Sequence, residues 1–257
     1  MFTLKSKNKN NNILKLIRLP DLITLINALF GFSAIIISLN DIKNISNSIL
    51  LILLAAIADG LDGAISRKCK SSNLSERRPS QKANGWGALE TSDFGANIDS
   101  LADAVSFGVA PAVIAYIVLK ENYPFWWGII FSSLYLMCGL LRLARFNVYI
   151  TNTKNFIGLP ITASGVFIVL FIMLLGEHGL ILIILLFFMS VLMVSRVNYL
   201  KVRDQRILIP LMAIFILLVL SYYLNSNLKQ SLSWILFSLI GIYVLSPIVL
   251  KGILRAV

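Results

Sequence analysis

Four aspartates stand inside long apolar stretches, where a carboxylate is an unusual residue. Asp59 and Asp62 are three residues apart, and Asp99 and Asp103 are four apart, so each pair shares one face if its stretch is helical. A carboxylate at membrane depth is energetically costly, which makes such residues functional candidates by default. Structural pairing with a basic residue would explain one aspartate, but it does not explain four in two neighbouring stretches. Because like charges repel strongly in a poor dielectric, the pattern predicts that cations bind between them.

The chemistry of these four side chains indicates a metal site that also holds phosphate. Sites made only of carboxylates suit hard divalent ions such as Mg²⁺ or Mn²⁺, usually with phosphate oxygens completing the shell. We expect all four aspartates to be metal ligands, with enough oxygens for two ions. Small residues around them would let the backbone approach a bulky ligand: Gly60, Gly63, Ala64, Ser66, Gly95, Ala96, Ala102 and Ala104. Arg67 follows on the first stretch, where its guanidinium group could bind a phosphate. These residues together predict a polyphosphate site.

The composition indicates which elements carry this site. Of the 257 residues, 58% are hydrophobic and 14% are charged, and the mean hydropathy is +0.83, whereas a soluble domain carries about 25% charged residues. Apolar runs of roughly 20 residues, enough to cross a bilayer, fill most of the chain. We therefore predict an all-α integral membrane protein, a single domain over 1–257 with eight transmembrane helices. The predicted helices cover 20–39, 46–67, 95–119, 124–148, 159–175, 179–194, 207–224 and 231–250.

The basic residues indicate how the chain is oriented in the membrane. A net charge of +11 would suggest nucleic acid in a soluble protein, but here the Lys and Arg residues lie between apolar segments, so no nucleic acid partner is expected. Twenty of the 23 Lys and Arg residues fall on one face of the predicted topology. Both termini should therefore be cytoplasmic, with a juxtamembrane segment at 1–19, a cytoplasmic loop at 68–93 and a site open to the cytoplasmic leaflet. Residues 13–19 could form a short helix on the membrane surface.

The aspartates also belong to a recognisable motif. The stretch D-G-L-D-G-A-I-S-R from Asp59 to Arg67, followed by G-A-N-I-D-S-L-A-D from Gly95 to Asp103, resembles the signature of the CDP-alcohol phosphotransferase family. That signature is D-x-x-D-G-x-x-A-R, a spacer, and G-x-x-x-D-x-x-x-D. Ser66 replaces the usual Ala, and the spacer is far longer than the family's usual eight or nine residues. The resemblance implies an enzyme that transfers a phosphate-linked group from a CDP-activated lipid to an alcohol.

Further stretches are similar to the phosphatidylserine synthase branch of this family. They are the continuation from Asp103 to Pro111, L-R-L-A-R-F-N from Leu141 to Asn147, and G-L-P-I-T-A from Gly158 to Ala163. The branch implies CDP-diacylglycerol, or an archaeal ether analogue, as the donor, L-serine as the acceptor and a homodimeric enzyme among membrane lipids. The sequence leaves open the chemistry of the lipid tails and the choice between Mg²⁺ and Mn²⁺.

Carried over to this sequence, the family motif implies a role for each residue. Asp59, Asp62 and Asp99 would bind metal, while Asp103 would contact the second metal and act as the general base. The expected CDP-binding residues are Gly63, Arg67, Ser92, Gly95, Asp21 and Thr24. The last two belong to P-D-L-I-T from Pro20 to Thr24, which is similar to the family's P-N-x-x-T, with Asp21 standing where Asn is usual.

The acceptor pocket is predicted from two arginines and leaves alternatives open. Arg142 and Arg145 share a helix face near the cytoplasmic boundary and could bind the carboxylate of serine. They could equally well anchor their helix among lipid headgroups. A phosphorylated acceptor, glycerol 3-phosphate or an inositol phosphate, would require several clustered basic residues. His178 is predicted on the opposite face of the membrane and is not expected to take part.

A divalent-metal transporter is the alternative outside the enzymes. A permeation path needs polar groups on both sides of the membrane, and transporters place their sites near the midplane between repeats. No intramembrane acidic residue is predicted beyond Asp103, because Glu177 and Asp204 fall in loops. The sequence therefore favours the enzyme over the transporter.

Overall fold

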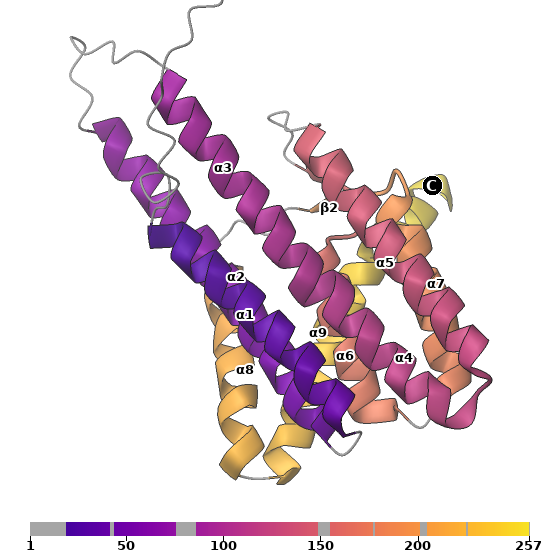
Figure 1. Ribbon diagram of the computed structural model, residues 1–257. Helices are drawn as coiled ribbons and strands as arrows, with labels where there is room; N and C mark the ends of the chain where they lie inside the picture. Colours follow the sequence, from indigo (N-terminus) through magenta and orange to yellow (C-terminus); the bar gives the residue numbers. More distant parts are fainter. Residues whose placement is uncertain are drawn as a thin grey trace, which may run out of the picture.

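The protein is a bundle of long helices (Figure 1). The computed structural model describes residues 19–41, 44–75, 86–148, 155–176, 178–200, 205–224 and 226–256. The elements are α1 (Leu19–Asn40), α2 (Ile45–Ser75), α3 (Trp86–Asp103), η3 (Ala104–Val109), α4 (Ala110–Asn122), α5 (Phe125–Val148), β1 (Asn155–Ile157), α6 (Ile161–Leu175), α7 (Gly179–Val194), β2 (Asn198–Leu200), α8 (Gln205–Leu224) and α9 (Ser226–Ala256). Since α3, η3 and α4 are continuous, the described residues form eight helical rods.

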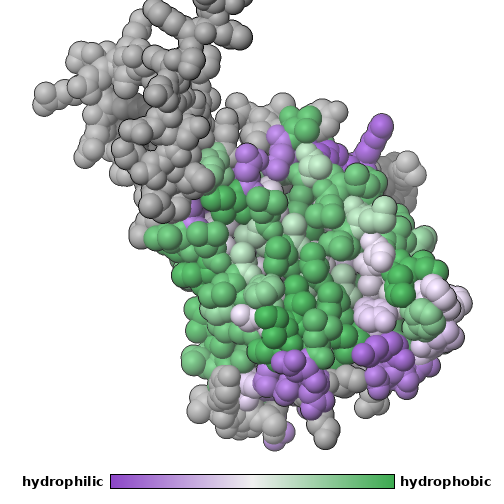
Figure 2. Space-filling model, in the orientation of Figure 1, coloured by the Kyte–Doolittle hydropathy of each residue, from purple (hydrophilic) through white to green (hydrophobic). Residues whose placement is uncertain are grey.

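The surface of the bundle fits a membrane. Figure 2 shows a wide apolar band with polar groups above and below it. Five of the described helical stretches are long and apolar enough to cross a bilayer: Pro20–Asn40, Ile45–Gly63, Phe94–Asn122, Phe125–Val148 and Asn227–Pro247. Three further apolar helices are shorter, at Ile161–Leu175, Gly179–Val194 and Ile209–Tyr222. The prediction of a multi-pass helical membrane protein is confirmed by these spans.

Helix α1 is turned with its small and polar side chains inward. Its buried positions recur every three or four residues: Asp21, Thr24, Asn27, Gly31, Ala34 and Ser38. Large side chains such as Leu29 and Phe32 are more than half exposed, at 58% and 56%. Apolar side chains lose nothing by facing lipid tails, so the inward face is free to carry polar groups and to approach its neighbours closely. This inward face lines the candidate site.

The predicted loop at 68–93 is wrong at both ends. Helix α2 continues to Ser75 and α3 begins at Trp86, so only residues 76–85 lie outside the described helices. The polar composition marks where the apolar stretch ends, but Lys and Arg are themselves good helix formers. No Pro or Gly interrupts the stretch from Ala64 to Ser75. The helix therefore has no local reason to end where its apolar stretch ends. The predicted surface helix at 13–19 lies outside the described residues except for its last residue.

A π-helical segment follows directly after Asp103. Within η3, the tight α-helical turn widens, and the backbone N–H of Ala110 donates to the carbonyl of Val105, five residues earlier. Pro111 has no N–H, so the ordinary α-helical bond to the carbonyl of Phe107 cannot form. The buried hydroxyl of Tyr135 donates to that carbonyl instead, at 2.7 Å. Such segments recur at functional sites because they redirect the side chains beside them.

The interior of the bundle is centred on α6. Ten of its 15 residues are buried, more than on the lipid-facing α1, so α6 is enclosed by its neighbours. A two-stranded antiparallel ribbon precedes it, in which Asn155 pairs with Leu200 and Ile157 with Asn198. This ribbon is the one departure of the described residues from an all-helical chain. It joins the segment after α5 to the segment after α7.

Candidate active site

Three of the predicted aspartates meet between α2 and α3. Asp59, Asp99 and Asp103 each offer a carboxylate oxygen, and these oxygens all lie within 4.8 Å of one another. Asp103 is buried, with 9% of its surface exposed, and its Oδ1 has no hydrogen-bond partner among the described residues. Three clustered carboxylates with an unsatisfied buried oxygen repel one another unless a cation lies between them. The donor set therefore fits a hard divalent metal ion.

Asp62 is not part of this three-carboxylate group. Its carboxylate accepts a hydrogen bond from the hydroxyl of Thr24 on α1, although it remains close enough to Asp99 to interact with it electrostatically. Asp59 and Asp62 therefore share one face of α2 as predicted, but their carboxylates have different partners. Of the four predicted ligands, three therefore form a compact group, and Asp62 lies beside it toward α1.

Two of the predicted CDP-binding residues lie at the contact between α1 and α3. Asp21 is 6% exposed, and its Oδ1 lies 2.9 Å from the place that a Cβ on Gly95 would occupy. Any side chain at position 95 would therefore displace Asp21, so the glycine permits this close approach. Thr24 is one helical turn further along α1 and also donates to the carbonyl of Pro20, at 3.2 Å. Gly63 is partly buried on α2, next to Asp62.

For two other predicted CDP-binding residues, the structure describes only the helix to which each belongs. Arg67 belongs to α2 and Ser92 to α3, but their side chains lie outside the described set. Cys69 has the same status, whereas Cys138 on α5 is a free thiol.

Arg142 is the cation that interacts with the carboxylates of Asp59 and Asp103 within the described residues. It lies on α5, is 7% exposed, and interacts electrostatically with Asp103 and Asp59. Its guanidinium carbon is 5.6 Å from the centre of the Phe146 ring. A buried guanidinium group beside buried carboxylates offsets part of their charge. One arginine cannot balance three carboxylates, so the requirement for a further cation remains.

Arg145 has a different environment from Arg142, the other arginine predicted to bind the acceptor. Its Nη1 donates to the carbonyl of Val194 at 2.9 Å, and its Nη2 donates to the carbonyls of Met193 at 2.9 Å and Ile157 at 2.7 Å. A longer bond reaches the carbonyl of Ser195, at 3.3 Å. The guanidinium group thus caps the carboxyl end of α7, where backbone carbonyls lack helical partners. The structure does not bring Arg145 together with Arg142 to form one carboxylate-binding pair.

Gly158 shows how tightly this cap is built. Its φ is +82°, a conformation that favours glycine. A Cβ at this position would overlap the carbonyl of Met193 and the Nη2 of Arg145. The backbone N–H of Gly158 also donates to the carbonyl of Val197, at 2.7 Å. Glycine is therefore required at the first position of the stretch G-L-P-I-T-A, because Gly158 packs directly against Arg145.

Three residues of the site were not predicted from the sequence. Thr162, near the start of α6, lies beside the carboxylate of Asp59, and it belongs to a stretch that the branch resemblance had already singled out. Tyr243 on α9 lies near Arg142 and had no motif around it. Asn27 on α1 is completely buried and lies beside the carboxylate of Asp103. The spacing of Asn27 could have revealed it, because it continues the polar series begun by Asp21 and Thr24 at intervals of three residues.

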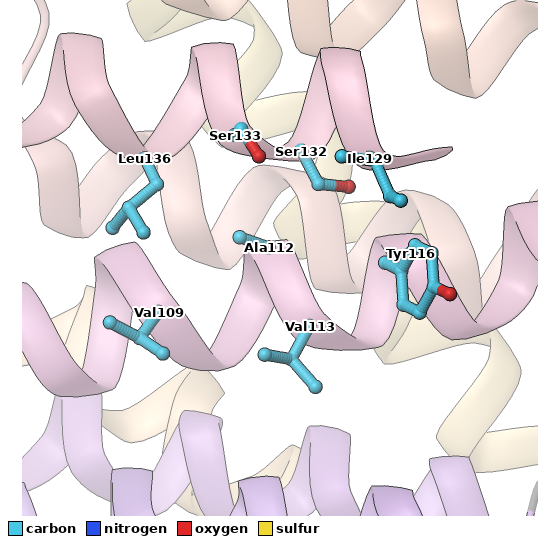
Figure 3. A pocket seen from close by; sticks show the side chains of 8 residues that line it. All are labelled: Val109, Ala112, Val113, Tyr116, Ile129, Ser132, Ser133 and Leu136. Atoms are coloured by element: carbon cyan, nitrogen blue, oxygen red, sulfur yellow. The ribbon is translucent and has the colours of Figure 1, made fainter. Parts of the chain in front are cut away.

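Two hollows in the described residues lie away from these aspartates. A hollow of about 330 Å³ lies between α4 and α5, where Val113 and Tyr116 face Ser132 (Figure 3). A second hollow, of about 310 Å³, is lined by His178 and by Ile45, at the end of α2 away from Asp59. His178 therefore lies away from the carboxylate group.

The described arrangement is suited to chemistry on a phosphate ester. A group of carboxylates that can hold divalent metal, a buried arginine and closely approaching small residues all lie where α1, α2, α3 and α5 meet. Divalent ions held by such carboxylates would bind the oxygens of a diphosphate, and a buried carboxylate can take a proton from an attacking hydroxyl.

Comparison with known proteins gives consistent matches. The family model described as CDP-alcohol phosphatidyltransferase matches residues 17–74 and 88–197. The chain is 34% identical over 193 residues to archaetidylserine synthase of Methanothermobacter thermautotrophicus, covering 75% of this chain and 74% of that protein. It is 36% identical over 194 residues to CDP-diacylglycerol–serine O-phosphatidyltransferase of Methanocaldococcus jannaschii, covering 76% and 79%. A Bacillus subtilis protein of the same name is 33% identical over 188 residues, covering 70% and 89%.

Proposed function

Because the chain belongs to the CDP-alcohol phosphatidyltransferase family, we propose that it transfers the phosphatidyl group of CDP-diacylglycerol, or an archaeal ether equivalent, to L-serine. CMP is the second product. The observation that carries the proposal is the meeting of Asp59, Asp99 and Asp103 within 4.8 Å, in a chain whose relatives are named for serine and archaetidylserine synthesis. Family membership makes this chain an enzyme rather than a metal transporter.

The proposed reaction is a substitution at the lipid phosphorus. The hydroxyl oxygen of serine forms a bond to that phosphorus, and the bond between the phosphorus and the bridging oxygen of CMP breaks. CMP leaves with the electron pair of that bond, and the serine proton passes to the carboxylate of Asp103. This role requires hydrogen-bond reach between Asp103 and the acceptor hydroxyl. The buried and unpartnered Oδ1 of Asp103 supports the assignment.

The aspartates are proposed to hold two divalent ions, Mg²⁺ or Mn²⁺. Asp59, Asp99 and Asp103 form the core of the ligand set, and Asp62 joins it from the α1 side, where Thr24 orients its carboxylate. When bound, divalent cations neutralise the diphosphate and the charge that develops on the leaving CMP. Asp59 and Asp99 link the set, since each interacts electrostatically with Asp62 and with Asp103.

The nucleotide is proposed to bind at the outer end of the site. The CDP group would lie beside the contact between Asp21 and Gly95. The other residues around it would be Thr24, Gly63, Arg67 and Ser92. Asp21 accepts hydrogen bonds where the usual Asn both donates and accepts. It therefore suits a donor such as the exocyclic amino group of cytosine.

Arg142 is proposed to bind the carboxylate of serine. Its burial beside Asp103 puts it next to the proposed base, and a guanidinium group pairs well with a carboxylate. Arg145 is proposed to support Arg142 through the end of α5 rather than to contact serine, because its donors are engaged by backbone carbonyls.

The proposed topology keeps the reaction at the cytoplasmic leaflet. It has eight spans in one polytopic domain, with both termini and the segment between α2 and α3 in the cytoplasm, as the distribution of basic residues predicts. The protein is further proposed to act as a homodimer.

Acceptor identity is tested by CMP release from purified protein. CDP-diacylglycerol and an ether-linked analogue are each incubated with Mg²⁺ or Mn²⁺ and with serine, glycerol 3-phosphate or inositol phosphate. The proposal expects CMP release that depends on serine and forms a serine phospholipid. Faster release with a phosphorylated acceptor would overturn the serine assignment and leave the reaction class intact. Release with none of the acceptors, from protein that remains folded and metal-bound, would overturn the transferase proposal.

A further inference from the structure

Asn27 is a buried polar side chain whose amide oxygen has no described partner. The residue is 0% exposed, its amide interacts with the carboxylate of Asp103, and its Oδ1 accepts no hydrogen bond from any described residue. A buried amide oxygen that accepts no hydrogen bond costs a folded protein free energy. Its own backbone is well held, because the hydroxyl of Ser106 in η3 donates to the Asn27 carbonyl at 2.8 Å. The backbone is thus fixed while the amide oxygen has unused hydrogen-bonding capacity.

The amide lies at the inner end of the candidate site. Along α1, Asp21 contacts the position of Gly95, Thr24 donates to Asp62, and Asn27 lies beside Asp103. Three residues of α-helix rise about 4.5 Å, so Asn27 is about 9 Å deeper than Asp21. The position next to the proposed base must be occupied by the molecule whose hydroxyl gives up its proton. Asn27 therefore borders the space of the acceptor rather than that of the nucleotide.

The charges around this space complement an amino acid. Arg142 can bind a carboxylate, and the Oδ1 of an asparagine accepts a hydrogen bond from an ammonium group. An amide supplies this acceptor without adding a negative charge beside Asp103. A simple hydroxy acid would leave Oδ1 unsatisfied, and sites with unpaired polar groups reject such analogues strongly.

We infer that Asn27 binds the acceptor, with its Oδ1 accepting a hydrogen bond from the ammonium group of an amino acid. Asn27 thereby makes the enzyme select amino acids over hydroxy acids of the same length. The inference rests on the proposed function, because it takes serine as the acceptor.

The test compares serine with 3-hydroxypropionate, which has the same hydroxyl and carboxylate but no ammonium group. CMP release is measured with both acceptors for the wild type, Asn27→Leu and Asn27→Asp. Leu is similar in size to Asn and satisfies the buried position without polar atoms. We expect Asn27→Leu to lower the ratio of kcat/KM for serine to that for 3-hydroxypropionate by about tenfold or more, since a hydrogen bond to a charged group is lost. The KM for the CDP-lipid should stay within about twofold of the wild type.

Ser132→Ala is the matched control. Ser132 is also a buried polar side chain whose hydroxyl has no described partner, but it lines the hollow between α4 and α5 (Figure 3). A general loss of buried polarity should affect both variants, whereas the selectivity ratio should change only for Asn27→Leu. An unchanged ratio in Asn27→Leu would overturn the inference.

Asn27→Asp provides a second test of the inference, which remains available even if the Leu variant does not fold. It keeps an acceptor oxygen in place, so it should retain or increase the preference for serine. Loss of that preference in folded Asn27→Asp would contradict the inference. A wild type that releases no CMP with serine would instead overturn the proposed function.

Discussion

Arg142 and Arg145 lie one turn apart on α5, yet their guanidinium groups have different partners. Arg142 is buried beside Asp103, whereas Arg145 donates to carbonyls at the end of α7 and in β1. Because the two residues share a turn, fixing one restricts the position of the other. The cap on α7 therefore connects the end of the bundle to the arginine that faces the carboxylates.

Arg145→Ala is expected to lower stability rather than serine binding alone. The change leaves several carbonyls without their donor, and a loss of about 2–4 kcal/mol is expected, since hydrogen bonds to charged groups contribute about 1.5–3 kcal/mol each and part is recovered by water. The unfolding temperature in detergent should fall by several degrees. Arg196→Ala, which removes an exposed arginine after α7, should leave it nearly unchanged. Equal stability of the two variants would contradict the structural role of Arg145.

Arg142→Ala is expected to raise the KM for serine by about ten- to a hundredfold, because a buried charge-assisted contact is lost. The KM for the CDP-lipid should change much less. Metal affinity should not fall, since the change removes a positive charge from beside the carboxylates. Steady-state kinetics with varied serine, together with metal titration, would measure both effects. A selective increase in the KM for the CDP-lipid would reassign Arg142 to the nucleotide side.

The positions of the helices were largely predictable from the sequence, whereas the residues at which the helices end beyond their apolar stretches were not. The predicted span at 124–148 agrees with α5 (Phe125–Val148), because a stretch of about 20 apolar residues has few other solutions in a membrane. At Arg67 the same reasoning failed. The polarity there marks the edge of the apolar stretch, but hydrogen bonding along the helix continues to Ser75.

The candidate site was predictable where a local spacing encodes it. Asp59, Asp99 and Asp103 were identified from their positions in apolar helices, and Asn27 could have been found from the polar series along α1. The partners of Arg145 could not be predicted, because they are backbone carbonyls in β1 and at the end of α7, the latter 48 to 50 residues further on. Every residue has a backbone carbonyl, so the sequence does not show which carbonyls accept from Arg145, and only the packed structure does.

Activity is expected to require a divalent cation. Excess chelator should abolish CMP release, and added Mg²⁺ or Mn²⁺ should restore it, because the three carboxylates within 4.8 Å are poorly placed to bind an anionic diphosphate without cations. The assay uses purified protein, with Ca²⁺ as a comparison ion of different size. Full turnover in chelator would exclude the metal-dependent reaction.

Asp59→Asn and Asp103→Asn are expected to differ in which property they damage. Asp59 interacts with two other carboxylates of the set, so its loss should reduce both metal affinity and turnover. Asp103→Asn should reduce turnover by about a hundredfold or more, the usual contribution of a general base, with a smaller effect on binding of the CDP-lipid. Metal titration and equilibrium binding of the CDP-lipid would separate these effects. Near wild-type turnover in Asp103→Asn would exclude it as the base.

The orientation of the bundle can be tested at its two ends. Ser75 ends α2 and Glu121 is exposed near the end of α4, so cysteines introduced there should lie on opposite sides of the membrane. With native cysteines replaced, a membrane-impermeant maleimide added to intact cells should label Glu121→Cys and not Ser75→Cys. Lysis should make both accessible, which controls for burial. The expectation follows from the basic residues around the α2–α3 connection, because Lys and Arg are retained on the cytoplasmic side. Labelling of Ser75→Cys from outside intact cells would reverse the topology and move the carboxylates toward the opposite leaflet.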